Sequence, residues 1–162
     1  MADQATERTT IDAAPDACWA VVLDFERYPD WARDIKQVDV IERDAEGRGL
    51  EVRFRAAAMG RSTNYTLRYD YTDAPHRLAW VLIAGDVTRK LDGHYHFAAA
   101  ESPAAESPAG TLVTYRLEAY LVVPLPGFVK RRAESMIVHT ALRELKARFE
   151  AEASDAGEGR AR

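Results

Sequence analysis

The chain has 162 residues, of which 47% are hydrophobic and 30% are charged, and its formal net charge is −4 at pH 7. This length suits one compact domain with its own core, residues 1–152, followed by a small and polar tail, residues 153–162, that we expect to be flexible. The negative net charge argues against a general nucleic-acid-binding surface.

The amino terminus lacks the order of basic and then apolar residues that a secretory signal has, and no apolar run approaches the ~18 residues needed to cross a bilayer. Cys18 is the only cysteine, so no disulfide can form within the chain. We therefore expect a cytoplasmic protein without a transmembrane segment. Transient contact with a membrane surface is compatible with this expectation.

The first third of the chain predicts one strand and two short helices. Residues 5–12 contain the β-branched run Thr9-Thr10-Ile11, which is typical of a strand. Pro15 opens a helix that must end before Pro29, because the residue preceding a proline avoids helical torsions. Residues 28–31 then predict a second short helix.

From Ile35 onward the period of the hydrophobic pattern changes from helical to two. Six segments with alternating apolar and polar residues follow, separated by turn signals such as Gly47, Pro75 and Gly85. Such alternation predicts an antiparallel sheet with one apolar and one wet face. Residues 100–104 and 105–109 repeat the sequence Ala-Glu-Ser-Pro-Ala, which we interpret as a solvated hairpin tip without function.

A long helix is predicted from Pro126 to about Glu150, since no glycine or proline interrupts the pattern there after Gly127. Its middle, Met136-Ile137-Val138, is apolar almost all round, and we expect such a helix to be covered on every side. The sheet would hold one face, while the other would meet a short helix, a ligand, a second protomer or a bend. Taken in order, the elements predict an α+β domain in which a sheet curls around a terminal helix.

Several stretches of the sequence resemble the polyketide cyclase/dehydrase branch of the START-like (SRPBCC, helix-grip) superfamily, which is also similar to coenzyme-Q-binding proteins of START type. These stretches are residues 11–19, 24–31, 93–97, 110–115 and 124–134, and the similarity extends over roughly residues 6–150. The resemblance implies a helix-grip fold, in which a curved antiparallel sheet of about seven strands surrounds a long C-terminal helix and two short helices follow the first strand. It also implies an elongated hydrophobic cavity under the long helix.

The candidate ligand-binding residues are large apolar side chains expected on the inner face of the sheet, at its rim or on the long helix. Tyrosine hydroxyls in such a cavity would orient a keto or hydroxy group, although each tyrosine alone also suits plain packing. The candidates are Trp31, Phe54, Tyr65, Tyr69, Trp80, Tyr95, Phe97, Tyr115, Leu117, Phe128, Met136 and Thr140.

Other polar groups are weaker candidates. His94 and His96 share one face of a strand next to Asp92, but alternation turns that face toward water, and no further ligand falls at metal-binding spacing. Lys130-Arg131-Arg132 occupies the first turns of the long helix, where cations are disfavoured by the helix dipole. We expect no metal and no cofactor, and we assign no catalytic residue.

Three functions remain open at this point. The first is binding of a hydrophobic small molecule such as a lipid, an isoprenoid or quinone, or a polyketide-like compound between the sheet and the C-terminal helix. The second is a polyketide cyclase, aromatase or dehydratase that acts on a bound poly-keto chain mainly by orienting it. The third is an interaction protein, such as a homodimer formed through the exposed side of residues 136–140.

Overall fold

The computed structural model describes the backbone of residues 3–58, 61–100, 110–121 and 127–160. The repeated segment 101–109 and the start predicted for the long helix, Pro126, lie outside these ranges. The elements are β1 (Asp3–Ile11), α1 (Pro15–Leu23), the 3-10 turn η1 (Phe25–Arg27), α2 (Tyr28–Trp31), β2 (Ile35–Arg43), β3 (Gly49–Ala58), β4 (Arg61–Asp70), β5 (Arg77–Gly85), β6 (Thr88–Ala99), β7 (Thr111–Leu121) and α3 (Gly127–Arg160).

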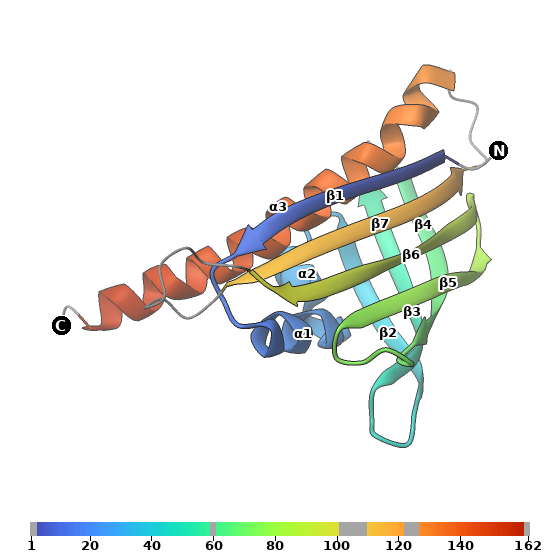
Figure 1. Ribbon diagram of the computed structural model, residues 1–162. Helices are drawn as coiled ribbons and strands as arrows, with labels where there is room; N and C mark the ends of the chain where they lie inside the picture. The colour runs from blue at the N-terminus through green and yellow to red at the C-terminus, as the bar shows by residue number, and fades with distance from the viewer. Residues whose placement is uncertain (1–2, 59–60, 101–109, 122–126, 161–162) are drawn as a thin grey trace.

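The strands of the described ranges form one seven-stranded antiparallel sheet in the order β1-β7-β6-β5-β4-β3-β2. Consecutive strands from β2 to β7 are neighbours, and β1 closes the order beside β7. Figure 1 shows α3 running alongside β1 and β7, with the short helices at one end of the curved sheet. The predicted helix-grip architecture is thereby confirmed.

Local sequence signals explain where the elements begin and turn. Pro15 and Pro29 stand in the first turns of α1 and α2, where a missing N–H costs no helical hydrogen bond. Between β2 and β3 the chain turns at Gly47, whose φ of +84° is a conformation that glycine adopts at little cost. The predicted strand, short helices and hairpin therefore form as the sequence indicates.

The long helix differs from its prediction in two respects. It continues past Glu150 to Arg160, because the added residues are mostly helix formers and two glycines do not suffice to end it. Its middle is also not covered on every side within this chain, since Met136 is 58% exposed and Ile137 is 37% exposed. Among the described side chains of α3, those of one face, with Val138, Leu142 and Leu145, are buried against the sheet. None of the described helices is long and apolar enough to cross a membrane.

Two polar contacts fix α3 along its length. His139 Nδ1 lies 2.8 Å from Glu7 Oε1 on β1. One turn and a half further on, Glu144 Oε2 accepts a hydrogen bond of 2.8 Å from the backbone N–H of Arg33, which follows α2. The helix is therefore held both to the edge of the sheet and to the short helices.

A close approach at the centre of the sheet requires a glycine at position 93. Gly93 on β6 pairs with Trp80 on β5, and a Cβ atom added to it would lie 2.4 Å from the carbonyl oxygen of Arg116 and 3.0 Å from the Trp80 indole. The missing side chain lets the indole lie against the backbone of β6. Gly93 therefore positions Trp80 in the interior.

We predict that Gly93→Ala lowers the free energy of unfolding by about 2–3 kcal/mol, because overpacking forces backbone shifts. Chemical denaturation measures the effect. A second substitution, Trp80→Leu, should not rescue the variant, because its closest contact is with backbone rather than with the indole. Full rescue by Trp80→Leu would show that the indole alone makes position 93 intolerant.

Candidate ligand-binding site

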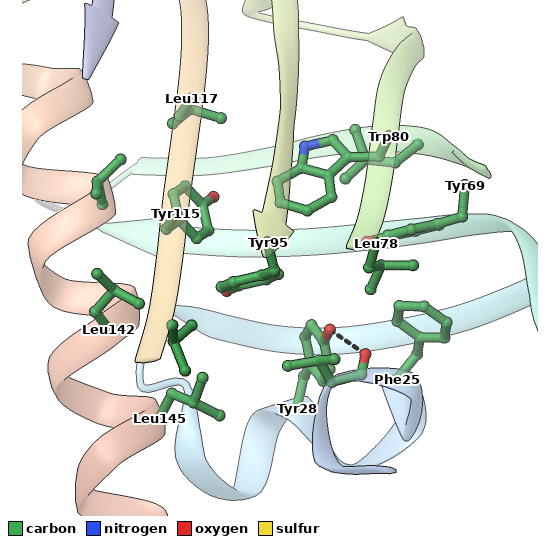
Figure 2. Packing of buried hydrophobic residues seen from close by; sticks show 14 of the residues in the cluster. Phe25, Tyr28, Tyr69, Leu78, Trp80, Tyr95, Tyr115, Leu117, Leu142 and Leu145 are labelled. Carbon is green, nitrogen blue, oxygen red and sulfur yellow. Dashed lines mark hydrogen bonds between the residues drawn. The ribbon is translucent and has the colours of Figure 1, made fainter. Parts of the chain in front are cut away.

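Aromatic side chains from four neighbouring strands meet on the inner face of the sheet. Tyr65 and Tyr69 come from β4, Trp80 from β5, Tyr95 from β6 and Tyr115 from β7, each placed inward by the alternation of its strand. The ring centroids of Tyr95 and Tyr115 are 4.5 Å apart, and the Trp80 ring lies 5.4 Å and 5.6 Å from them. Figure 2 shows Tyr69, Trp80, Tyr95 and Tyr115 projecting into the same interior. We call these five residues the aromatic cluster.

The short helices supply further rings below the aromatic cluster. Phe25 of η1 lies 4.6 Å from the ring of Tyr69, and Tyr28 of α2 lies 5.9 Å from that of Phe54 on β3. Phe54 in turn stacks on Tyr65 at 5.3 Å. A continuous set of rings therefore extends from the helices at one end of the sheet to the centre of its inner face.

The tyrosines of this region fall into two groups according to their hydroxyls. Tyr28 donates a hydrogen bond of 2.5 Å to the carbonyl oxygen of Val22, and Tyr71 donates one of 2.5 Å to that of Gly49. In contrast, no group within the described part of the chain hydrogen-bonds the hydroxyls of the four tyrosines in the aromatic cluster. Tyr28 and Tyr71 therefore hold the fold together, while the hydroxyls of the aromatic cluster are available.

The side chains of the aromatic cluster are not completely enclosed. Tyr69, Trp80, Tyr95 and Tyr115 keep 5–7% of their surface, whereas their neighbours Leu78, Phe97 and Leu117 keep 0–1%. None of the four tyrosine oxygens is among the fully enclosed polar atoms without a partner that the described residues contain. The aromatic cluster is therefore slightly less enclosed than the side chains that surround it.

Burial decides the charge state of these hydroxyls. It raises the pKa of Tyr69, Tyr95 and Tyr115 well above the usual value of a phenol, and neighbouring tyrosines add to this effect. Burial is also the main cause of the raised pKa of Tyr65, and the negative charge of the Asp34 carboxylate raises this pKa further. All four hydroxyls stay protonated at physiological pH, so they can donate hydrogen bonds but cannot act as bases.

Two hollows lined by described residues lie at the surface, outside the aromatic cluster. One, of about 50 Å³, is bordered by residues of α1, η1, α2 and α3, among them Asp24, Asp30 and Trp31. The other, also about 50 Å³, lies beside Asp73 and Arg77. Each has room for only one or two water molecules. The rings of the aromatic cluster themselves occupy the centre of the inner face.

The structure brings together most, but not all, of the residues that the sequence suggested as ligand-binding. Trp31, Tyr65 and Thr140 are half-buried, with Trp31 packed at 5.0 Å on the Tyr28 ring. Met136 points to solvent, because it lies on the face of α3 opposite the buried one, and we exclude it from the site. The side chain of Phe128 lies outside the described residues, as do those of Lys130, Arg131 and Arg132. The buried candidates are Phe54, Tyr69, Trp80, Tyr95, Phe97, Tyr115 and Leu117.

Sequence reasoning missed three residues of this region. Phe25 and Tyr28 are buried, but they belong to segments of three and four residues in which no periodicity can be recognised. Glu134 on α3 is only 4% exposed, and its spacing of four from Val138 places both on the buried face of the helix. That spacing was the one available signal for a buried carboxyl group.

The Asp92–His96 motif has a different environment. Asp92 Oδ1 accepts a hydrogen bond of 2.9 Å from the backbone N–H of Leu82, and His94 Nδ1 lies 3.4 Å from Arg77 Nη2. Among the described residues no three histidine, cysteine or acidic side chains are grouped so that they could hold a metal ion. The Asp92 side chain instead continues the pairing of β5 and β6 beyond the Trp80–Gly93 pair.

Comparison with solved structures gives the same fold. A START superfamily protein from Mycobacterium smegmatis is 21% identical over 91% of this chain and 97% of that chain, with a TM-score of 0.80. The Zhui aromatase/cyclase from Streptomyces sp. R1128 is 16% identical over 97% of this chain and 99% of that one, with a TM-score of 0.72. A major latex-like protein 151 from Panax ginseng is 11% identical over 91% and 97%, with a TM-score of 0.66.

No curated protein matches the chain. Residues 3–150, however, match the protein family described as polyketide cyclase / dehydrase and lipid transport. This match covers the whole sheet, both short helices and α3 up to Glu150. The chain therefore belongs to the polyketide cyclase / dehydrase and lipid transport family.

Proposed function

We propose that the protein binds a flat and largely apolar small molecule, carrying a carbonyl or hydroxyl group, between the inner face of the sheet and α3. The observation that carries this proposal is the set of four protonated phenol hydroxyls within an apolar interior, none of which has a hydrogen-bond partner among the described residues. Binding sites of this kind use apolar walls for affinity and a few polar groups for orientation. A quinone, an isoprenoid, a lipid or a polyketide-like compound fits this description.

The energetics of such a site favour a ligand with at least one polar atom. Removing about 300 Å² of apolar ligand surface from water contributes roughly 7 kcal/mol at ~25 cal/mol per Å², before the cost of association. A hydrogen bond from Tyr95 or Tyr115 to a ligand carbonyl adds about 0.5–1.5 kcal/mol. Apolar burial therefore supplies the affinity, and the hydroxyls select the orientation.

Entry of a ligand requires some of the rings to move. The rings of Trp80, Tyr95 and Tyr115 lie 4.5–5.6 Å apart, so a flat molecule must displace at least one of them. Tyr65 is the most exposed residue of the aromatic cluster, because it is half-buried while the other four are buried. We propose Trp31, Phe54, Tyr65, Tyr69, Trp80, Tyr95, Phe97, Tyr115, Leu117 and Thr140 as the ligand-contacting residues.

The second candidate function is that of a polyketide cyclase, aromatase or dehydratase. The presence of four hydrogen-bond donors in one aromatic cluster supports it, because donors can fix the keto groups of a reactive chain in one geometry. The raised pKa of these tyrosines disfavours proton abstraction by them, so catalysis here would rest on orientation. Of the similar structures, the Streptomyces protein is itself an aromatase/cyclase.

The two groups of tyrosines should differ in their contribution to stability. Tyr28→Phe removes a buried hydrogen bond to Val22, and we predict a loss of about 1–2 kcal/mol in the free energy of unfolding. Tyr69→Phe, Tyr95→Phe and Tyr115→Phe should each change it by less than about 0.5 kcal/mol, because no protein group loses its partner. Urea denaturation of the four variants measures this. Large losses for the last three would mean that their hydroxyls serve the fold.

Paired probes test the role of the hydroxyls in binding. We predict that 1,4-naphthoquinone binds the wild-type protein and quenches the fluorescence of Trp80. Its affinity should fall about three- to ten-fold in Tyr95→Phe and Tyr115→Phe, because each loses a donor to the quinone carbonyl. Naphthalene, which has no carbonyl, should bind both variants as it binds the wild type. Tyr71→Phe is the matched control, since its hydroxyl is committed to Gly49.

Two results would contradict the proposal. If neither probe bound, and native mass spectrometry after incubation with a lipid extract found nothing retained, the interior would not be a ligand site. If both probes weakened equally in the variants, the hydroxyls would have no orienting role. Changed products from a poly-keto substrate in the Tyr69, Tyr95 and Tyr115 variants would favour the enzymatic function over simple binding.

A further inference from the structure

The outer face of the sheet, opposite the aromatic cluster, carries a group of basic residues that the proposed function does not use. The strand register places them in two adjacent rows that run across β1, β7, β6 and β5. The first row is Arg8, Thr114, His96 and Arg77, and the second is Thr6, Arg116, His94 and Ala79. We call Arg8, Arg77, His94, His96 and Arg116 the outer basic patch.

The two rows of the outer basic patch contain no carboxylate that would neutralise its positive charges. On β1, β7, β6 and β5 neither row contains an acidic residue. Two carboxylates face the patch at its β5 end: Asp73 lies 3.7 Å from Arg77, and Asp70 on β4 pairs with Ala79 and interacts with the Arg77 charge. Arg116 donates its hydrogen bond of 2.7 Å to the neutral amide of Gln4. In the next row Glu118 is paired with Lys90 at 3.0 Å. The patch thus concentrates positive charge on a chain whose net charge is −4.

The surroundings of His94 show that the positive charges of the outer basic patch repel one another when no ligand is bound. Its ring is half-buried between Arg77 of β5 and Arg116 of β7, with His96 two residues along β6 and Asp92 two residues the other way. Burial first, and then the charges of Arg77, Arg116 and His96, lower the pKa of His94. An anion seated between the two guanidinium groups would relieve this repulsion.

The dimensions and donor types indicate which anion fits. Strands ~4.8 Å apart make the patch about 14 Å wide, and the two rows are about 7 Å apart, so more than one oxyanion group can lie on it. Arginine presents N–H donors in a fork that matches the oxygens of a phosphate group. We propose that the outer basic patch binds a phosphate-bearing ligand that carries at least two negative charges. This site is separate from the aromatic cluster, because alternate residues of the same strands point to opposite faces.

Titration with inorganic pyrophosphate tests the proposal. At an ionic strength of about 0.01 M, where screening acts only beyond roughly 30 Å, calorimetry should detect binding that weakens as salt is added. Arg77→Gln and Arg116→Gln should each reduce the affinity about three- to ten-fold, because each removes a charged donor. The matched control is Arg68→Gln, an outer-face arginine that is already paired with Glu51 at 3.0 Å and should change the affinity less than about two-fold.

The histidines supply an independent readout by NMR. Because pyrophosphate favours the charged form of His94, binding should raise the pKa of His94 from its lowered value. With the protonation of pyrophosphate itself subtracted, affinity should therefore increase as the pH falls through the pKa of His94 in the complex. His94→Gln should flatten this pH dependence. His139, which lies against Glu7 on the α3 side of the sheet, is the control residue, and pyrophosphate should leave the positions of its NMR signals unchanged.

A second experiment distinguishes a soluble phosphate ligand from a lipid headgroup. Phosphatidylcholine vesicles with and without phosphatidic acid are tested for co-sedimentation with the same variants. Pyrophosphate binding that Arg77→Gln and Arg116→Gln weaken supports a soluble ligand, and selective vesicle binding with the same dependence supports a lipid phosphate. The proposal is overturned if neither probe binds, or if Arg68→Gln weakens binding as much as the two patch variants do.

Discussion

The structure depends on one geometric constraint, namely that a single helix has to cover the concave face of a seven-stranded sheet. Along its described length α3 packs mainly on β1 and β7, and the short helices close one end of the sheet. The inner surfaces of β4, β5 and β6 must therefore be covered by their own side chains. Tyrosine and tryptophan are large enough to do this, and they bring polar tips into a region that leucine or phenylalanine would leave entirely apolar.

The polar tips distinguish this interior from a purely apolar core. Two tyrosines donate their hydroxyl hydrogens to backbone carbonyls: Tyr28 thereby links α2 to α1, and Tyr71 links the end of β4 to the start of β3. The tyrosines of the aromatic cluster make no such bonds among the described residues, and burial keeps them protonated. Neutral donors in an apolar setting suit the recognition and orientation of a carbonyl group better than proton transfer, which favours binding over acid–base catalysis.

The same strands give the two faces of the sheet different chemistry. On β6 the side chain of Tyr95 enters the interior, while those of His94 and His96 on either side of it join Arg77 and Arg116 outside. Gly93 lets Trp80 approach closely on the inner side. Because the side-chain period of a strand is two, a slip of one residue in register would exchange the two faces, and both sites would be lost together.

The sequence by itself determined the element order, the one-sided sheet, the short helices opened by Pro15 and Pro29, and the inward direction of Tyr69, Tyr95 and Tyr115. These features follow from local patterns, because proline geometry and the alternation of a strand act within a few residues. Only the tertiary structure decided that Met136 faces solvent, that Phe25 and Tyr28 join the aromatic rings, and which hydroxyls are committed. Those outcomes depend on which segments meet across the sheet. A contact between two segments that are far apart in the chain leaves no periodic signal in the sequence of either segment.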